Sequence, residues 1–297
     1  MRVFVTGATG FIGSVVVKDL IAAGHQVVGL SRSKEKASAL AAAGAEVVFG
    51  STQDIDGLKR AAAESDGVIH LAFNHDFSKF AVNCEDDHRA ITALGAALEG
   101  SDRPLIVTSG TLIAYHASGQ PALETDGAIS SKEHLRAATE EAAAAVGARG
   151  VNVSVVRLPQ VHDTTRQGLI TFAIAMAREK GVCAYIGDGE NRWPAAHVLD
   201  TAHLYRLALE KAERGARYHA VAEEGVKLRD INEILGKCLN LPVKSIAPEE
   251  AESHFGWLAM FAGLDAPASS ALTRQRLDWQ PKARGMIADL TELQLDC

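Results

Sequence analysis

The sequence predicts an α/β protein built on a doubly wound parallel sheet. In the first half of the 297 residues, short β-rich segments alternate with longer helical segments at a steady interval, which is typical of successive β-α-β units. A glycine-rich turn joins the first strand to the first helix, and later helical segments end on Gly24, Gly44 and Gly147. The alanine-rich helices share no fixed period, so we do not expect a repeat array.

Each element follows from its local pattern. Apolar, β-branched segments predict strands at Arg2–Thr6, Gln26–Leu30, Glu46–Phe49, Val68–Leu71, Leu105–Ser109 and Val153–Arg157. The intervening segments predict helices at Phe11–Ala23, Lys34–Ala43, Ile55–Ala63, Glu85–Leu98 and Ser131–Val146. After Arg157 the alternation loosens, with helices expected at Leu169–Lys180, Val198–Glu213 and Leu228–Leu239 and a strand at Tyr218–Val221. No Ser-, Gly- or Pro-rich linker intervenes. We therefore expect a dinucleotide-binding domain over 1–160 and a smaller substrate lobe over 161–297, interwoven with the sheet, with a ligand cleft between them.

Composition and charge exclude several classes of function. The chain is 47% apolar, 23% charged and 5% aromatic, as in ordinary soluble globular proteins. Its net charge of −7 and scattered basic residues argue against a nucleic-acid partner. No apolar segment approaches the roughly 20 residues of a membrane span. The sequence opens directly on a strand pattern, so we expect no signal peptide and a cytoplasmic location. The cysteines show neither Cys-x-x-Cys pairing nor zinc-like spacing with histidine, so we expect no metal site and no disulfide frame; they are Cys84, Cys183, Cys238 and Cys297.

The glycine-rich turn after the first strand is the sharpest motif. Gly7 permits a tight turn, Gly10 allows the backbone to approach a pyrophosphate, and Gly13 lets the helix lie close to the sheet. A strand before this motif and a helix after it favour dinucleotide binding in a Rossmann-type fold over a structural glycine turn. The predicted cofactor contacts here are Gly7, Thr9, Gly10, Phe11, Ile12 and Gly13.

The end of the second strand indicates which dinucleotide binds. Sites that prefer NAD place an acidic residue about 20 residues after the glycines, to bind the ribose 2′-hydroxyl. This chain has Ser31, Arg32 and Ser33 there and no acid before Glu35. Arg32 and the serines, Ser31 in particular, suit a 2′-phosphate, so we expect NADP(H). If Arg32 instead only stacks on adenine or points to solvent, NAD(H) is also tolerated.

Four later segments extend the pattern: His70-Leu71-Ala72, Val107-Thr108-Ser109-Gly110-Thr111, Arg157-Leu158-Pro159-Gln160-Val161 and His197-Val198-Leu199-Asp200. Together with the glycine loop, they resemble the extended short-chain dehydrogenase/reductase superfamily, in its NAD-dependent epimerase/dehydratase group, over nearly the whole chain. We add Leu71, Ala72 and Pro159 to the expected cofactor contacts on this resemblance. The fold is thereby supported more than the reaction, because many chemistries share this scaffold.

The resemblance implies a catalytic hydroxyl just after the fifth strand, acting with a Tyr-x-x-x-Lys pair on the next helix. Thr111 fits the hydroxyl, four residues before Tyr115. The pair is missing, because no tyrosine occurs between Tyr115 and Tyr185. The chain is therefore similar to an atypical branch, a bacterial and fungal group with a distinctive Gly187–His197 segment, which is usually described only as NAD(P)-dependent epimerases or reductases.

Three registers describe what replaces the pair. Counting back from the Val153–Arg157 strand places Arg136 at the lysine position, Lys132 at the tyrosine position and Glu140 at the following helix acid. A looser register keeps Lys132 as the lysine, with Ala128 at the tyrosine position. Counting forward from Thr111 places Arg136 at the tyrosine position and Glu140 at the lysine position. We favour the first, because a helix and a short turn tolerate insertions less than the loop over 116–128 does. The candidate catalytic residues are Thr111, Lys132 and Arg136.

These residues favour an NADP(H)-dependent oxidoreductase that reduces a small aldehyde or ketone, with Thr111 bound to the carbonyl oxygen. The alternative is an NADP(H)-binding redox sensor with little turnover; a nucleotide-sugar epimerase or dehydratase is a third hypothesis. The Lys132 ammonium can donate a proton near neutral pH only if burial or a neighbouring charge makes it easier to deprotonate. Other candidate donors are Tyr115, His75, His116, His162 and His197, with His75 and His162 favoured by position. Aromatic residues of the smaller lobe, Trp193, Phe255, Trp257 and Phe261, fit an apolar substrate pocket, plain core or a dimer face. The protein is expected to be a monomer or a homodimer.

Overall fold

The computed structural model describes residues 1–115 and 119–294. Its centre is a seven-stranded sheet in the order β10-β6-β5-β4-β1-β2-β3, with every neighbouring pair parallel. The predicted doubly wound parallel sheet is confirmed. The strands are β1 (Arg2–Thr6), β2 (Gln26–Ser31), β3 (Glu46–Phe49), β4 (Gly67–His70), β5 (Pro104–Gly110), β6 (Asn152–Leu158) and β10 (Arg217–His219). His116 and Cys297 lie outside the described residues.

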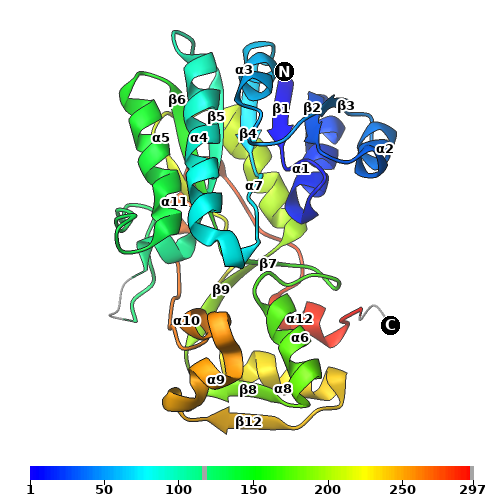
Figure 1. The fold of residues 1–297 in the computed structure, drawn as a ribbon, viewed down its shortest axis with the longest axis vertical. Helices are drawn as coiled ribbons and strands as arrows, with labels where there is room; N and C mark the ends of the chain where they lie inside the picture. Colours follow the sequence, from blue (N-terminus) through cyan, green and yellow to red (C-terminus); the bar gives the residue numbers. More distant parts are fainter. Residues whose placement is uncertain (116–118, 295–297) are drawn as a thin grey trace.

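Helices cover both faces of the sheet (Figure 1). One face carries α1 (Phe11–Ala22), α2 (Lys34–Ala42), α7 (Val198–Lys211) and α11 (Ala271–Leu277). The other carries α3 (Ile55–Ala63), α4 (Phe80–Leu98) and α5 (Ala138–Ala148). Each face has its own apolar core, with Val5, Val16 and Trp279 buried on the first and Leu58, Leu94 and Val146 on the second. Burial on both faces explains why the strand segments read as continuous apolar stretches.

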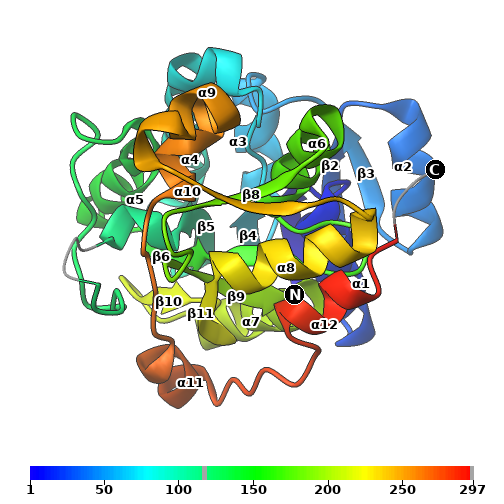
Figure 2. The same cartoon turned by 90° about the horizontal axis from the view of Figure 1, so that it is seen from below.

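The remaining elements form a smaller unit, here called the small lobe, which lies beyond one end of the sheet (Figures 1 and 2). Its elements are β7 (Gln160–His162), α6 (Ile170–Lys180), β8 (Cys183–Ile186), β9 (Arg192–His197), β11 (Glu223–Lys227), α8 (Leu228–Leu239), β12 (Val243–Ile246), α9 (Ala251–Phe255), α10 (Ala259–Ala262) and α12 (Met286–Thr291). The strands pair as β11-β9-β7 and β12-β8. Trp193, Phe255 and Phe261 are buried in this lobe's own core, whereas Trp257 is 37% exposed.

The carboxyl ends of the central strands face the small lobe. Short 3₁₀ helices follow β4 and β5, namely η1 (Phe77–Lys79) and η2 (Thr111–Ala114). Phe77 of η1 stacks on Trp257 of η5 (Gly256–Leu258), with ring centroids 4.3 Å apart. Leu112 of η2 packs against the core of the small lobe. The loops that bear function in doubly wound folds therefore lie between the sheet and this lobe.

Two predicted helix starts were wrong by more than one residue. The helix expected from Ser131 begins only at Ala138, after a turn at 131–133 and a 3₁₀ turn, η3 (Leu135–Ala137). The reason is local capping, because the Ser130 hydroxyl accepts from the N–H of Lys132 and the His134 ring accepts from that of Arg136.

The helix expected from Glu85 instead begins at Phe80. Asp76 caps the preceding η1 turn by accepting from the N–H of Ser78. Phe77 and Phe80 then stack on one another, with centroids 5.8 Å apart. The strand expected at Tyr218–Val221 is β10, one residue earlier and shorter. Within the described part of the chain, no helix is both long and apolar enough to cross a bilayer.

Candidate functional site

The glycine loop between β1 and α1 is formed by residues that tolerate no side chain. Gly7 has φ +68°, and a Cβ there would lie 2.8 Å from the backbone nitrogen of Ala72. A Cβ on Gly13 would lie only 2.0 Å from the carbonyl oxygen of Gly7. The N–H of Gly10 donates to that same oxygen at 2.9 Å. The loop is thus held tightly between the start of α1 and the segment after β4, which contains Leu71 and Ala72.

The start of α1 fits an anionic ligand. Gly10 is the N-cap residue, and within residues 1–115 and 119–294 no side chain caps the first turn. The N–H groups there have no intrahelical acceptor, and the helix dipole adds partial positive charge. Thr9, Phe11 and Ile12 flank this end and are half-buried. An uncapped helix start beside a loop with glycine at its two closest approaches is the arrangement that accepts a pyrophosphate.

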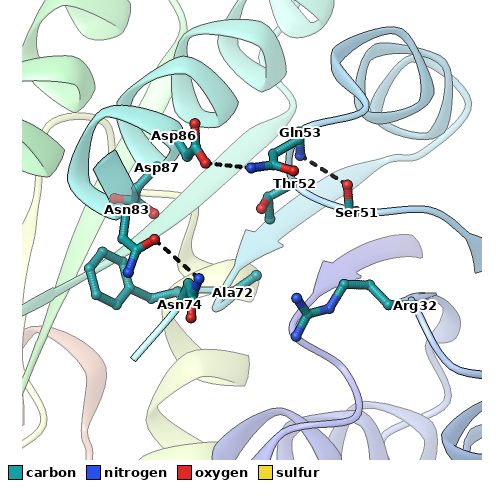
Figure 3. A pocket seen from close by; sticks show the side chains of 10 residues that line it. Arg32, Ser51, Thr52, Gln53, Ala72, Asn74, Asn83, Asp86 and Asp87 are labelled. Carbon is teal, nitrogen blue, oxygen red and sulfur yellow. Dashed lines mark hydrogen bonds between the residues drawn. The ribbon is translucent and has the colours of Figure 1, made fainter. Parts of the chain in front are cut away.

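A pocket opens beside this loop at the ends of β2, β3 and β4 (Figure 3). The exposed side chain of Arg32 extends into it and has no hydrogen-bond or ion-pair partner in residues 1–115 and 119–294. Ser31 is buried, and its hydroxyl donates to the carbonyl of Ser33 rather than into the pocket. The other lining residues are Ser51, Thr52, Gln53, Ala72, Phe73, Asn74, Asn83, Asp86 and Asp87. The two carboxylates of this lining are already paired, Asp86 with Gln53 and Arg89 and Asp87 with Arg136. The unpaired guanidinium of Arg32 with the hydroxyl and amide groups around it therefore suits a phosphate-bearing ribose.

Arg136 reaches the ends of β4 and β5 from η3. Its guanidinium donates to Asp87 at 2.7 Å and to the carbonyl oxygen of Thr108 at 3.0 Å, and it also contacts Thr139. The guanidinium carbon lies 4.1 Å from the centroid of the Phe73 ring. A cation is therefore fixed where the two central strands end, between an aromatic face and a buried carboxylate.

The other candidate catalytic residues are placed differently. Thr111 is buried at the start of η2, and its hydroxyl donates to the carbonyl of Leu158 at 3.4 Å, next to Pro159. Lys132 lies in the 131–133 turn with an exposed side chain. Tyr115 follows η2 and is half-buried. The structure therefore brings Thr111 and Arg136 to adjoining strand ends and leaves Lys132 at the surface.

The candidate histidines separate into two places. His75 lies beside Phe73, with ring centroids 5.3 Å apart, and desolvation followed by the charge of Arg136 lowers its pKa. His162 is fully buried in β7, hydrogen-bonded to Asp289 at 2.7 Å and 5.7 Å from the ring of His197. Burial lowers the pKa of His162 more than Asp289 raises it. Of the described candidate histidines, His75 is the one beside Arg136.

A tyrosine hydroxyl does lie near the end of β5, but it comes from the opposite face. Tyr205 of α7 shares a 2.7 Å hydrogen bond with the hydroxyl of Thr108. Its side chain is completely buried, and that burial raises the pKa of the phenol strongly. Its hydroxyl is bonded to Thr108 and no part of the side chain is exposed to meet a ligand, so we do not assign Tyr205 the role of the missing tyrosine of the Tyr-x-x-x-Lys pair.

Sequence reasoning missed Asp87 and Phe73, which contact Arg136, and the ring of His70, which is bonded to Asp87. A signal for Asp87 was present, because α4 buries Asn83, Ala90, Ile91 and Leu94 at helical spacing and position 87 falls on that same face. A carboxylate on a buried helix face requires a partner. In the described part of the chain, no group of His, Cys, Asp and Glu side chains is arranged to hold a metal ion.

The fold and the loop define a Rossmann-type, NAD(P)-binding protein. The chain belongs to the NAD dependent epimerase/dehydratase family, whose model matches residues 3–222. It is 46% identical over 291 residues, 98% of either chain, to Uncharacterized protein C2A9.02 of Schizosaccharomyces pombe. It is 30% identical to 2'-dehydrokanamycin reductase of Streptomyces kanamyceticus, covering 83% of this chain and 69% of that one.

The fold is similar to solved structures of this group. One is DesIV, a dTDP-glucose 4,6-dehydratase from Streptomyces venezuelae with NAD bound, at a TM-score of 0.79 and 19% sequence identity. The match covers 99% of this chain and 95% of that chain. At this identity, the likeness concerns the fold.

Proposed function

We propose that this protein is an NADPH-dependent reductase of a small aldehyde or ketone. The observation that carries the proposal is the presence of two cations at the carboxyl ends of the central strands. Arg32, which has no partner within residues 1–115 and 119–294, lies at the end of β2, and Arg136 lies at the ends of β4 and β5. The first suits a 2′-phosphate, and the second suits the ribose or the developing alkoxide beside the reacting carbon. The similarity to the 2'-dehydrokanamycin reductase of Streptomyces kanamyceticus supports the reaction class.

In this proposal, particular residues of the chain bind the cofactor and the carbonyl oxygen. The glycine loop and the start of α1 would hold the pyrophosphate, and Arg32 the 2′-phosphate. When bound, NADPH supplies the hydride for the carbonyl carbon. Arg136 would stabilise the negative charge that develops on the substrate oxygen. Thr111 would orient that oxygen once its hydroxyl turns from Leu158.

The proton for the alkoxide would come from His75, which lies next to Phe73 under the influence of Arg136. Since the pKa of His75 is below its ordinary value of 6.5, only a minor fraction is protonated at neutral pH. Turnover should then rise as the pH falls through that lowered pKa. In His75→Gln this rise should vanish, whereas His254→Gln in α9 should keep it; the measurement is the pH profile of kcat/KM.

The reaction itself is tested with purified protein, NADPH and a broad panel of aldehydes and ketones, following the loss of reduced nicotinamide absorbance. The proposal expects turnover that falls in Thr111→Ala and in Arg136→Met while NADPH binding is retained in Thr111→Ala. Lys132→Ala tests the surface lysine in the same assay. Binding of NADPH without turnover of any carbonyl would contradict the reductase.

A redox sensor is the second candidate, and one observation favours it. Asp87, Thr139 and the Thr108 carbonyl already occupy the guanidinium of Arg136, so it is held without any substrate. A sensor would bind NADP(H) tightly and recruit a partner that distinguishes loaded from empty protein. A partner captured in different amounts with and without NADPH would support the sensor. Identical pull-downs in the two conditions would contradict it.

A further inference from the structure

Asp87 is a buried carboxylate at the centre of the site that no motif assigned. It projects inward from α4 beside Asn83 (Figure 3), and its side chain is 3% exposed. Three side chains donate to it: His70 of β4 to one oxygen at 3.1 Å, and Arg136 at 2.7 Å and Thr139 to the other. One oxygen of Asp87 therefore faces the His70 side of the site, and the other faces Arg136 and Thr139.

The hydrogen bonds on the His70 side have a fixed direction. A carboxylate only accepts, so the Nε2 atom of His70 carries the donated proton. In the neutral imidazole the Nδ1 atom accepts from the Thr6 hydroxyl at 2.8 Å, and that hydroxyl in turn accepts from the N–H of Ala72 at 3.2 Å. Thr6 is the last residue of β1 and directly precedes the glycine loop. One side of Asp87 is thus tied to the strand that carries the loop.

The other side of Asp87 holds Arg136. Burial alone would raise the pKa of Asp87, but Arg136, His70 and Thr139 together outweigh it, so the carboxylate pKa lies below its usual value. The ionised carboxylate gives the guanidinium a counter-ion that cannot move, since α4 is packed against α3 and α5. The Phe73 ring covers one face of the guanidinium.

We propose that Asp87 is the positioning residue for the nicotinamide end of the cofactor site, acting through Arg136. It sets the position of the guanidinium relative to the glycine loop, because the same carboxylate is bonded through His70 and Thr6 to the end of β1. The proposal depends on the proposed function only in placing Arg136 at the nicotinamide end.

Binding measurements test this inference without catalysis. In Asp87→Asn, NADPH should bind about tenfold more weakly, the effect expected from removing one charge of a buried pair. The fragment 2′,5′-ADP lacks the nicotinamide end and reports on the Arg32 pocket, which Asp87 also lines. Its dissociation constant should stay within about twofold of wild type, because both oxygens of Asp87 are bound by His70, Arg136 and Thr139 rather than turned toward the 2′-phosphate. Asp19→Asn breaks an Asp–Arg pair between α1 and α7 and is the matched control, with both constants unchanged. Equal weakening of NADPH and of 2′,5′-ADP in Asp87→Asn would overturn the proposal.

A double-mutant cycle asks whether Asp87 acts through Arg136. In the Arg136→Met background, adding Asp87→Asn should change NADPH binding by less than about twofold. Should the single variant Asp87→Asn not fold, Arg136→Met and the double variant still provide this comparison. A further loss of about tenfold in the double variant would show an independent role and contradict the proposal.

Turnover adds a readout that separates the two proposals. If carbonyl reduction is observed, Asp87→Asn should lower kcat more than it raises KM for the carbonyl, because the transition-state charge is what Arg136 binds. If no carbonyl is reduced, the reductase is wrong, and the binding constants still decide on Asp87.

Discussion

At the residue scale, Arg136 and the lysine implied by the family resemblance are not equivalent cations. A guanidinium is planar and donates from several nitrogens, so it can bind Asp87 and the Thr108 carbonyl while its face rests on Phe73. A lysine ammonium is a point charge without such a face. An arginine does not give up its proton, so the proposed reduction needs a different proton donor, for which His75 is our candidate.

Arg32 should decide between the two dinucleotides. Arg32→Ala removes the one cation among the described residues that line its pocket, and hydrogen bonds to a charged group contribute about 1.5–3 kcal/mol. We expect NADPH to bind roughly 10- to 100-fold more weakly and NADH to be little affected. Fluorescence titration of both dinucleotides measures this, with Arg149→Ala at the end of α5 as the control. A similar loss for both dinucleotides would contradict a 2′-phosphate contact.

Gly13 is predicted to accept no side chain. In Gly13→Ala the new Cβ would meet the Gly7 carbonyl oxygen at 2.0 Å, so α1 must move away from the loop. Overpacking of this kind costs about 1–3 kcal/mol. Thermal unfolding should show the loss of stability, together with weaker NADPH binding. Gly127→Ala is the matched control, because nothing lies within 4 Å of the position that its new Cβ would take; a neutral Gly13→Ala would contradict the close contact.

At the element scale, β6 is joined to α5 and β10 through one buried arginine. Arg157 is fully buried and forms two 2.8 Å hydrogen bonds with Glu140 of α5. It also meets the Nε2 atom of His219 of β10 at 3.3 Å, while Nδ1 of that ring faces the carbonyl of Ser269. Burial and then the Arg157 charge lower the pKa of His219 to about 4.

This network predicts a loss of stability in acid. Between pH 6.5 and about 4, the unfolded chain binds a proton at His219 and the folded chain does not, so stability falls as the pH is lowered through this range. The shift corresponds to about 3 kcal/mol. His219→Gln keeps a donor and an acceptor but does not titrate, so its unfolding free energy should depend less on pH. His88→Gln of α4 is the control; identical slopes in wild type and His219→Gln would refute the argument.

Elements whose signals are local could be predicted from the sequence. The strand Arg2–Thr6, the helix Ile55–Ala63 and the helix Leu228–Leu239 were predicted to the residue, because apolar period and end signals coincide there. The late start of α5 depends on the side chains of Ser130 and His134 bonding to the backbone, which no periodicity reveals. The short strands of the small lobe gain their identity from pairing with distant segments, as β8 does with β12.

In the candidate site, too, residues of one continuous motif could be predicted and contacts between distant segments could not. The glycine loop is one continuous motif, so its residues could be found together. Arg136 was found by counting along a helix that starts later than expected, and its partners Phe73, Asp87 and Thr108 come from three separate elements. Contacts between such distant segments are set by the packing of β4, β5 and α4, and a single sequence does not report them.

At the scale of the whole molecule, an aromatic contact joins the sheet to the small lobe. Phe77 and Trp257 stack, and Phe172 of α6 packs edge-on against both rings at 5.9 and 5.2 Å. Phe172 and Trp257 are each 37% exposed, so these rings form a rim rather than a core. The rim adjoins the segment after β4 that contains Phe73 and His75.

Phe77→Ala should loosen the small lobe without unfolding the sheet. Aromatic pairs of this geometry contribute about 0.5–1.5 kcal/mol beyond their buried area, so local opening should become about 2- to 10-fold more frequent. Amide hydrogen exchange should accelerate in α9 and α10 and stay unchanged in β5. Phe49→Ala at the edge strand β3, where the ring is 58% exposed, should leave the small lobe unaffected. Unchanged exchange in α9 and α10 would contradict the role of this contact.

The path of the chain between the two units has a consequence for biosynthesis. After β6 the chain enters the small lobe, returns to the sheet for α7 and β10, leaves again for β11 through α10, and returns once more for α11 before α12 ends in the lobe. On the ribosome, the edge of β6 that β10 covers therefore stays unpaired until about residue 219 has emerged. A nascent chain stalled before that point should expose the unpaired backbone groups of β6 and depend on chaperones to avoid aggregation. In the complete protein β10 covers this edge.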